Sequence, residues 1–353
     1  MTNIIKKDDL LNFCTEACKK FGLSDETSRI TAEVLTETDM MGTYSHGTKN
    51  LLDYMRKIQA GGIKVNGEIK VLKEGPAWAM MDGDASIGML CGYRAMEKAI
   101  EKAKEAGIGF VNIKNSTHYG AAGYYACMAA REGMIGVSMS NTDPNMTVPG
   151  GKGKGIGNSP LSIAVPQKCG DPMFLDIALS AVAALKVAKA RQAGQSIPDT
   201  WIVDKNGYPS TNPADFYDDG AAQPMAAHKG YGLAMMVEIL TGVLAGGALL
   251  HDMKSWCLDL PSENKVSHCF IAIDISKFSD LDEFEDRLET YTDAIHNSPK
   301  RDDSNAIYVP GEIENARYAK AVTDGVILPD DVADFLQKLS ELSGVEINIK
   351  KVD

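Results

Sequence analysis

The fold class is decided by one stretch of the chain, GIGFVNIKNSTHYGAAGYYACMAAR, residues 107–131. Residues 107–113 are rich in β-branched and aromatic side chains and are typical of a buried strand. Residues 121–130 are small and apolar, which predicts a packed helix. His118 therefore lies at a turn from strand to helix, where Ser116 or Thr117 could cap the helix and the helix dipole would favour a neutral imidazole.

A neutral imidazole at such a turn can exchange a proton with a substrate oxygen. Gly120, Ala121, Ala122 and Gly123 follow with almost no side-chain bulk, so a ligand or another backbone could approach closely. Taken alone, a histidine that only caps its own turn explains the pattern slightly better. The choice between the two interpretations depends on the rest of the chain.

Strand-like and helical runs alternate on both sides of this stretch. This alternation predicts an α/β layer with a mixed sheet. The glycine-rich residues 141–160 contain no G-x-G-x-x-G, and no helix follows them, so we predict a flexible or ligand-covering loop and not a Rossmann phosphate loop. The strand-like runs are 77–81, 107–113, 135–140, 161–165, 173–177, 269–275 and 307–309, and the helical runs are 8–21, 24–41, 49–58, 88–106, 121–131, 180–193, 233–245, 280–297 and 330–343.

Composition restricts the class of protein. The chain of 353 residues has a formal net charge of -12, which argues against nucleic acid as a partner. No run is long enough to span a bilayer, and the N-terminus has no apolar signal core, so we expect a cytoplasmic protein that does not act at a membrane. The seven cysteines are scattered and are expected to be reduced core residues, and no zinc set is formed by Cys14 and Cys18.

Three further positions could bind a ligand or carry chemistry. His46 lies in the polar turn 43–47, where a histidine is more often a solvated surface residue. Asp176 ends a predicted strand, where α/β proteins bind ligands, although it could also cap the following helix. Lys229 opens the very apolar helix 233–245 and could hold an anionic group there. That helix must be buried, and a subunit interface is one place where this could happen.

The order and spacing of these pieces resemble the second type of the malate/L-lactate dehydrogenase family, which includes sulfolactate, ureidoglycolate and diketogulonate oxidoreductases and a cyclic-imine carboxylate reductase. The resemblance implies an α/β, non-Rossmann fold like that of L-sulfolactate dehydrogenase. It implies a helical domain at 1–74 completed by 299–353, an α/β domain at 75–298 that binds the nicotinamide cofactor, and a homodimer. The matching motifs are Ser45-His46-Gly47, Ser116-Thr117-His118-Tyr119-Gly120, Pro149-Gly150-Gly151, Asn158-Ser159-Pro160-Leu161, Asp176-Ile177-Ala178, Lys229-Gly230-Tyr231-Gly232-Leu233 with Glu238, and Pro310-Gly311-Glu312.

The resemblance also implies site residues. Proton transfer falls on His46 and His118, with Asp176 near the nicotinamide, and no metal is implied. The cofactor is NAD or NADP. Cofactor contacts fall on Thr142, Asp176, Ile177, Ala178, His228, Lys229, Pro310, Gly311 and Glu312, and substrate contacts on Ser45, Asn50 and Tyr54.

One departure from the family concerns the substrate. The family usually has an arginine four residues after the first histidine to hold the substrate carboxylate, and Asn50 stands there in this chain. Lys49, Arg56 or a residue elsewhere could replace that arginine, or the clamp is absent. Lesser departures are Ser159 for asparagine, Leu179 for threonine and Ala226 for glycine.

The sequence therefore predicts an NAD(P)-dependent oxidoreductase that interconverts a small 2-oxo acid and a 2-hydroxy acid of the malate, lactate, sulfolactate or ureidoglycolate type. The alternatives are an NAD(P)H-dependent reductase of a cyclic imine carboxylate and a non-catalytic metabolite-binding member of the family. A metal-dependent hydrolase is a weaker alternative, because no H-E-x-x-H or related spacing occurs.

Overall fold

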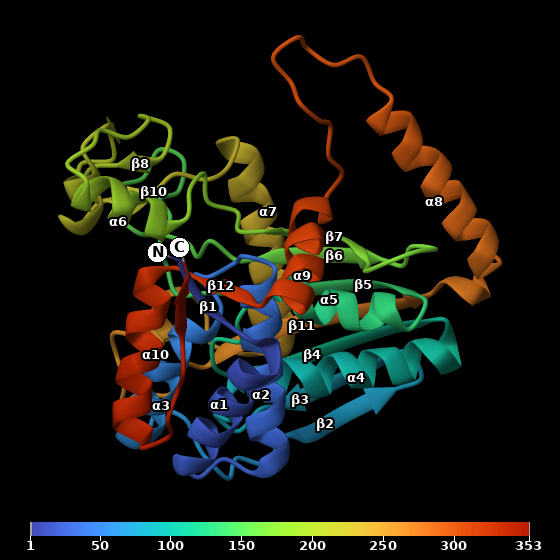
Figure 1. Cartoon of the computed structure of the whole chain (residues 1–353), viewed down its shortest axis with the longest axis horizontal. Coiled ribbons are helices and arrows are strands. Elements are labelled where there is room, and N and C mark those ends of the chain that lie inside the picture. The colour runs from blue at the N-terminus through green and yellow to red at the C-terminus, as the bar shows by residue number, and fades with distance from the viewer. Residues whose placement is uncertain (1, 353) are drawn as a thin grey trace.

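The computed structural model describes residues 2–352 and is built around a mixed sheet (Figure 1). In this part of the chain seven strands have the order β2-β3-β4-β11-β5-β6-β7. Only β3 and β4 pair in parallel, and the other neighbours are antiparallel. The predicted α/β class with a mixed sheet is confirmed. The strands are β2 (Lys70–Gly75), β3 (Trp78–Asp82), β4 (Ile108–Ser116), β5 (Met134–Ser140), β6 (Leu161–Val165), β7 (Met173–Ile177) and β11 (Val266–Asp274).

Helices cover both faces of the sheet. On one face lie α4 (Gly88–Ala106) and α5 (Ala122–Arg131), and on the other α7 (His228–Glu238), which continues as the π-helical turn η3 (Ile239–Val243). Alternation along β11 separates the two faces, because Phe270 packs with the helices α4 and α5 while Cys269 packs with α7. Gly109 allows α4 to approach the sheet closely, since a side chain there would collide with the backbone of Ala99.

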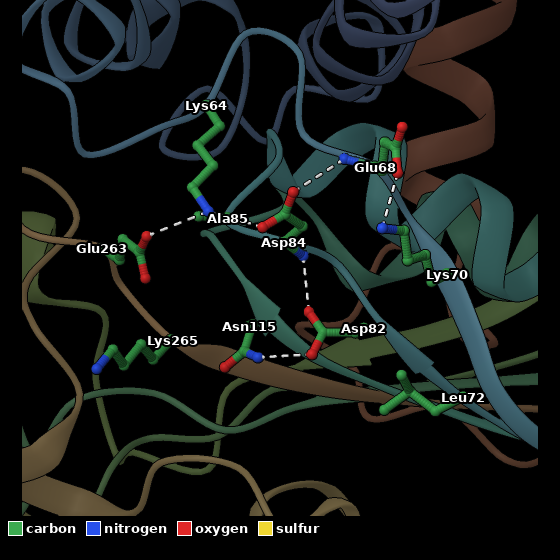
Figure 2. A pocket seen from close by; sticks show the side chains of 10 residues that line it. All are labelled: Lys64, Glu68, Lys70, Leu72, Asp82, Asp84, Ala85, Asn115, Glu263 and Lys265. Atoms are coloured by element: carbon green, nitrogen blue, oxygen red, sulfur yellow. Dashed lines mark hydrogen bonds and ion pairs between the residues drawn. The ribbon is translucent and has the colours of Figure 1, made fainter.

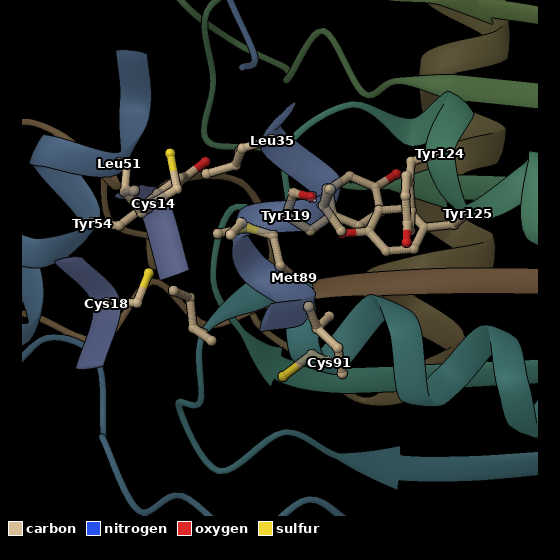
Figure 3. Close-up of a cluster of buried hydrophobic side chains, with 14 of the residues drawn as sticks. Cys14, Cys18, Leu35, Leu51, Tyr54, Met89, Cys91, Tyr119, Tyr124 and Tyr125 are labelled. Atoms are coloured by element: carbon tan, nitrogen blue, oxygen red, sulfur yellow. Dashed lines mark hydrogen bonds between the residues drawn. The ribbon is translucent and has the colours of Figure 1, made fainter. Parts of the chain in front are cut away.

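The two ends of the chain meet in a helical layer beside the sheet. It contains α1 (Lys7–Lys20), α2 (Asp25–Met40), α3 (Leu51–Ala60), α9 (Glu312–Asp324) and α10 (Asp330–Ser343). A small antiparallel sheet joins the ends, with β1 (Thr2–Ile5) between β12 (Val326–Leu328) and β13 (Lys350–Val352). One core, partly shown in Figure 3, runs from this layer into α4, β4 and α5. The predicted domain boundaries, after residues 74 and 298, stay predictions. The hydrophobic core contains residues from both sides of each boundary.

The segment between β7 and β11 forms a smaller lobe, and its core is continuous with one face of the large sheet. It contains α6 (Ala184–Gln192), η2 (Pro213–Tyr217) and a sheet of β8 (Ile202–Val203), β9 (Pro209–Ser210) and β10 (Ala221–Ala222). After β11, the helix α8 (Leu281–His296) projects from the body in Figure 1. Short 3-10 turns are η1 (Thr48–Asn50), η4 (Leu250–Asp252) and η5 (Ile275–Lys277).

Several sequence-based predictions about elements are wrong in detail. The helix predicted at 49–58 begins at Leu51, after η1, and the one predicted at 180–193 begins at Ala184. Residues 307–309 are not a strand, because they lie in the extended connection from α8 to α9 and pair with no sheet. Within residues 2–352, no helix combines the length and the apolar character needed to cross a membrane.

The predictions based on burial have different outcomes. The burial of the apolar helix 233–245, for which a subunit interface is one place, stays a prediction, since Met236, Val243 and Leu244 are 51%, 53% and 60% exposed in the single chain. The prediction that the cysteines are core residues is wrong for two of them. Of the seven free cysteines, five are buried, but Cys169 and Cys257 are exposed. The periodicity of apolar residues does not distinguish a core from an apolar surface.

Candidate active site

The loops at one edge of the sheet surround a cavity of about 690 Å³. His118 comes from the turn after β4, Thr142 from the loop after β5 and Asp176 from the end of β7. The turn between α2 and η1 contributes His46, and the irregular segment before β11 contributes Trp256. Three segments that are far apart in the sequence therefore bring both predicted histidines and the aspartate to one cavity, whose size is typical of small-ligand sites.

Hydrogen bonds fix the ring of His118. Nδ1 lies 2.5 Å from the Tyr54 hydroxyl and accepts a 3.4 Å hydrogen bond from the Gly120 backbone N–H. Burial, followed by the nearby rings of His46 and His268, holds the pKa of His118 well below its usual range. Because the Gly120 N–H makes Nδ1 an acceptor, Tyr54 donates its hydroxyl proton and the ring proton lies on Nε2. The imidazole is neutral, as predicted, but burial and not the helix dipole is the main cause.

His46 stacks on His118, with ring centroids 5.6 Å apart. Its Nδ1 lies 2.9 Å from the Ser45 hydroxyl, and burial lowers its pKa. The turn that carries it is tied to α2, because Asp39 accepts hydrogen bonds from the backbone N–H and the hydroxyl of Thr48. Burial raises the pKa of Asp39 to about 7. His46 is therefore not a solvated loop residue but part of the cavity wall.

Asp176 connects the end of β7 to the start of α5. Its Oδ2 accepts a 2.7 Å hydrogen bond from the backbone N–H of Gly123 in the first turn of that helix. Burial raises its pKa to about 6, although the hydrogen bond opposes this shift. The predicted alternative, that Asp176 caps the helix after it, is wrong, since α6 begins at Ala184 with Ala183 as its N-cap. A side chain at position 123 would lie 2.9 Å from Asp176 Oδ2, so glycine permits this contact.

Comparison with known proteins identifies the architecture around this cavity. The model of the malate/L-lactate dehydrogenase family matches residues 5–337. The chain belongs to this family. It is 37% identical over 349 residues to the malate dehydrogenase of Pyrococcus abyssi, covering 97% of this chain and 95% of that protein. It is 34% identical to the ureidoglycolate dehydrogenase (NAD(+)) of Escherichia coli K12, covering 89% of each.

A solved structure of the same family superposes over nearly the whole chain. The sulfolactate dehydrogenase of Methanocaldococcus jannaschii has a TM-score of 0.89 and 34% identity, and the match covers 97% of each chain. The resemblance inferred from the sequence motifs is thus confirmed, and the family fold extends over the described residues.

The other residues predicted from the malate/L-lactate dehydrogenase resemblance divide into two groups. Ser45, Thr142, Ala178, Pro310 and Gly311 line the cavity. Tyr54 and Asn50 are buried beside it, where Tyr54 binds His118 and Asn50 donates to the Ser45 carbonyl. Ile177, His228, Lys229 and Glu312 do not line the cavity in the single chain. His228 and Lys229 are exposed at the start of α7, and Glu312 pairs with His296.

The predicted cap of α5 is wrong. Its N-cap residue is Ala121, and no side chain caps it there. Thr117 instead accepts a 2.8 Å hydrogen bond from the backbone N–H of Gly88, the first residue of α4. Thr117 therefore ties the turn that carries His118 to the neighbouring helix.

Lys49 and Arg56, the two residues proposed to replace the family arginine, form ion pairs outside the cavity. Lys49 donates to Asp331 on α10 at 2.7 Å. Arg56 is exposed and pairs with Asp53. Neither lines the cavity.

Sequence reasoning missed several residues at the site. Trp256 stacks on His118, with centroids 4.6 Å apart, and its ring is tilted against that of Tyr54 at 5.1 Å. Asn264 lines the cavity from the same irregular segment, which has no periodicity to reveal it. His268 bridges the hydroxyls of Ser140 and Ser116 inside the sheet, at 2.9 and 2.8 Å. The sequence did contain one signal for this contact, because His268 is a histidine within an otherwise apolar strand, where a polar side chain needs a buried partner.

A second hollow, shown in Figure 2, is shallower and charged. Its side chains pair with one another: Lys64 binds Asp84 at 2.6 Å, and Asn115 donates to Asp82 at 2.8 Å. The histidine cavity is therefore the candidate active site of this malate/L-lactate dehydrogenase family member.

Proposed function

We propose that the chain is an NAD(P)-dependent oxidoreductase that interconverts a 2-hydroxy acid, or a derivative of one, and its 2-oxo form. The observation that carries this proposal is the pair of stacked histidines, His46 and His118, in one cavity with Asp176. The family relatives named for malate, ureidoglycolate and sulfolactate support the reaction class. One of them is named for NAD(+), which supports a nicotinamide cofactor.

The polar groups of the cavity suit a nicotinamide. Gly123 and Gly311 pack directly against Asp176 and Phe174, where a Cβ would lie 2.9 and 2.8 Å from their atoms, so this wall of the cavity requires glycine at both positions. Asn145 lines the cavity and has an unpartnered Oδ1 that could accept from a carboxamide N–H. Thr142, Ala178, Pro310 and Gly311 would hold the cofactor within the non-Rossmann family fold. A nicotinamide bound there would supply the hydride for the carbonyl carbon.

Residues of the chain would bind the substrate carbonyl oxygen and transfer the proton to it. Nε2 of His118 carries a proton and faces a site partly shielded from water, so it can donate a hydrogen bond to the carbonyl oxygen. His46 lies beside it and provides a second ring for proton exchange with the developing alkoxide. Tyr54 and Ser45 hold the Nδ1 atoms of the two rings and thereby orient their Nε2 atoms.

The chain is further proposed to work as a homodimer. Leu233, Met236, Val243 and Leu244 form an exposed apolar stripe on α7 and η3, on the side away from the sheet. Contiguous apolar surface of this kind is typical of a subunit interface. His228 and Lys229 lie at the start of the same helix and stay proposed cofactor contacts.

The test is loss of absorbance of NADH, and separately of NADPH, with 2-oxo acids, their derivatives and cyclic imine carboxylates. His46→Ala and His118→Ala should each lower kcat by about 10²–10⁴-fold, while NADH still quenches tryptophan fluorescence with nearly unchanged affinity. His251→Ala, at an exposed histidine, is the matched control. Wild-type turnover in both variants would contradict the proposal. Quenching with no turnover of any compound would favour a metabolite-binding protein.

A further inference from the structure

The charged side chains that line the candidate active site in the single chain are all acidic. Among residues 2–352, no lysine or arginine lines the cavity, whereas Glu37, Asp143, Asp176 and Glu314 do. Glu37 is paired with Arg131 at 3.0 Å, but Asp143 is partly buried and has a raised pKa because of that burial. An ionised carboxylate placed here would lose water without gaining a cation, which is unfavourable.

Three basic residues on η1 and α3, next to the turn of His46, bind other groups. Lys49 binds Asp331, and Arg56 pairs with Asp53 on the exposed side of α3. Lys57 is fully buried, but its ammonium binds the backbone carbonyls of Asp259 and Ser262 at 2.7 and 2.6 Å and reaches that of Leu260 at 3.4 Å. These three acceptors match the three N–H donors of an ammonium, so none is free for a substrate.

A buried hydrogen-bond acceptor lies at the same edge of the sheet. Asn264 is 1% exposed, lines the cavity and donates through Nδ2 to the Lys254 carbonyl. That bond fixes the orientation of the amide and leaves Oδ1 without a partner. Val266, two residues later, pairs with Ser116, so Asn264 is close in the sheet to the turn of His118. An unpartnered buried acceptor requires a donor, which an ionised carboxylate cannot supply.

The wall beside His118 is aromatic. Trp256 stacks on His118 and packs at a tilt against Tyr54. The segment that carries Trp256 is held in place by the bonds from Lys57 to the carbonyls that follow it. An aromatic wall next to an unpartnered acceptor suits a neutral group that carries an N–H or O–H.

We infer that the substrate presents an uncharged hydrogen-bond donor, a carboxamide or a hydroxymethyl group, beside the reacting carbonyl in place of a free carboxylate. This inference rests on the proposed function and narrows its substrate class. In the reaction the carbonyl carbon would gain a hydride from the reduced nicotinamide as the C=O π bond breaks, and its oxygen would gain a proton that comes from water through the histidine pair. The products are the secondary alcohol and the oxidised cofactor, and the neighbouring group is unchanged.

The experiment compares matched 2-oxo compounds with NADH and with NADPH: pyruvate, 2-oxobutyrate and phenylpyruvate, their amides and methyl esters, and hydroxyacetone. The best amide or hydroxymethyl compound should exceed its free acid in kcat/KM by at least about tenfold. It should also exceed the ester, which is neutral but has no donor, because only a donor satisfies Asn264. A free acid preferred by tenfold would overturn the inference while leaving the proposed function intact. No reduction of any compound would contradict both.

Two variants test the residues involved. Asn50→Arg adds a cation beside the cavity and should shift the ratio of acid to amide turnover toward the acid by about tenfold or more. Lys49→Arg is the matched control, because its side chain faces α10, and it should leave the ratio unchanged. Asn264→Leu should remove the advantage of the amide over the ester. An unchanged ratio in both Asn50→Arg and Asn264→Leu, with melting temperatures near wild type, would contradict the assigned contacts; if either variant fails to fold, the wild-type ratios decide.

Discussion

The reactivity of His118 is set by single residues around it. Tyr54 lies on its Nδ1, Trp256 covers a ring face and His46 stacks nearby. Each contact removes water or fixes a proton, so the ring is neutral and has one tautomer. The chemistry assigned to this histidine therefore depends on Tyr54 and Trp256, which are given no contact with the substrate carbonyl, as well as on His46.

Tyr54→Phe should lower kcat by about tenfold, because the ring loses the donor that keeps its proton on Nε2. KM should change less, since the phenol group lies behind the ring. Steady-state kinetics over a range of pH would measure both, and the profile should also change, because the lost donor alters the pKa of the ring. Tyr208→Phe, at a tyrosine 70% exposed, is the control. An unchanged kcat and pH profile would contradict the role given to Tyr54.

Asp176→Asn should stabilise the protein at neutral pH but not in acid. Burial raises the folded pKa of Asp176 from 3.8 to about 6, so the folded state binds a proton more tightly than the unfolded state does. The stability of the wild-type protein therefore falls as pH rises through this window. Asparagine does not titrate and can still accept from Gly123.

The stability difference between Asp176→Asn and wild type should grow from under about 1 kcal/mol near pH 4 to about 3 kcal/mol well above pH 6. Urea unfolding at a series of pH values would measure it. A difference that is constant over this range would show that the effect of the substitution is not electrostatic.

At the scale of elements, the start of α7 is strained. Ala226 and Ala227 have φ of 48° and 54°, and Ala227 has ψ of -119°. This conformation is costly for a residue with a Cβ and is typical of glycine. The departure from the family at Ala226 is therefore part of a turn that two alanines occupy with difficulty.

Ala227→Gly should raise the free energy of unfolding by about 1 kcal/mol, because glycine adopts this conformation without a steric penalty. Thermal or urea unfolding would measure the gain. Ala183→Gly is the matched control, since Ala183 is also an N-cap residue but has φ of -72°. It should not be stabilised, and an equal gain in both variants would exclude relief of strain as the cause.

Elements with regular local patterns could be predicted from the sequence, and those formed by distant pairing could not. The strands β6 and β7 and the helix α10 have the predicted bounds, because apolar alternation and helical spacing are local. By contrast, β1 pairs with strands more than 320 residues away, which no local pattern indicates. The helix α9 was missed for a different reason, because only Ala321 in it is buried and its apolar periodicity is therefore weak.

The residues of the candidate site also fall into two groups, those that local sequence patterns indicate and those that only the tertiary structure reveals. His46, His118 and Asp176 follow recognisable turns and strand ends, and the structure brings all three to the cavity. Trp256 and Asn264 come from an irregular segment whose position depends on the tertiary bonds of Lys57 and Lys254. No sequence motif pairs the residues that these bonds join. The aromatic wall formed by Trp256 and the unpartnered Oδ1 of Asn264 could therefore be found only from the structure.

At the scale of the whole molecule, the apolar stripe on α7 and η3 is expected to be covered by a second copy. Met236→Glu combined with Leu244→Glu should convert the dimer to a monomer, because two carboxylates per subunit would be buried without partners. Light scattering coupled to size-exclusion chromatography would measure the mass, which is 38.0 kDa for one chain.

The matched control for this double variant is Phe278→Glu combined with Leu258→Glu. These two residues are 75% and 87% exposed but lie outside the stripe, so this control should remain a dimer. If the first variant is monomeric and inactive, with a far-ultraviolet circular dichroism spectrum like that of wild type, the activity depends on assembly. A wild-type protein that elutes as a monomer at micromolar concentration would contradict the dimer. The stripe would then be an exposed apolar surface with another partner.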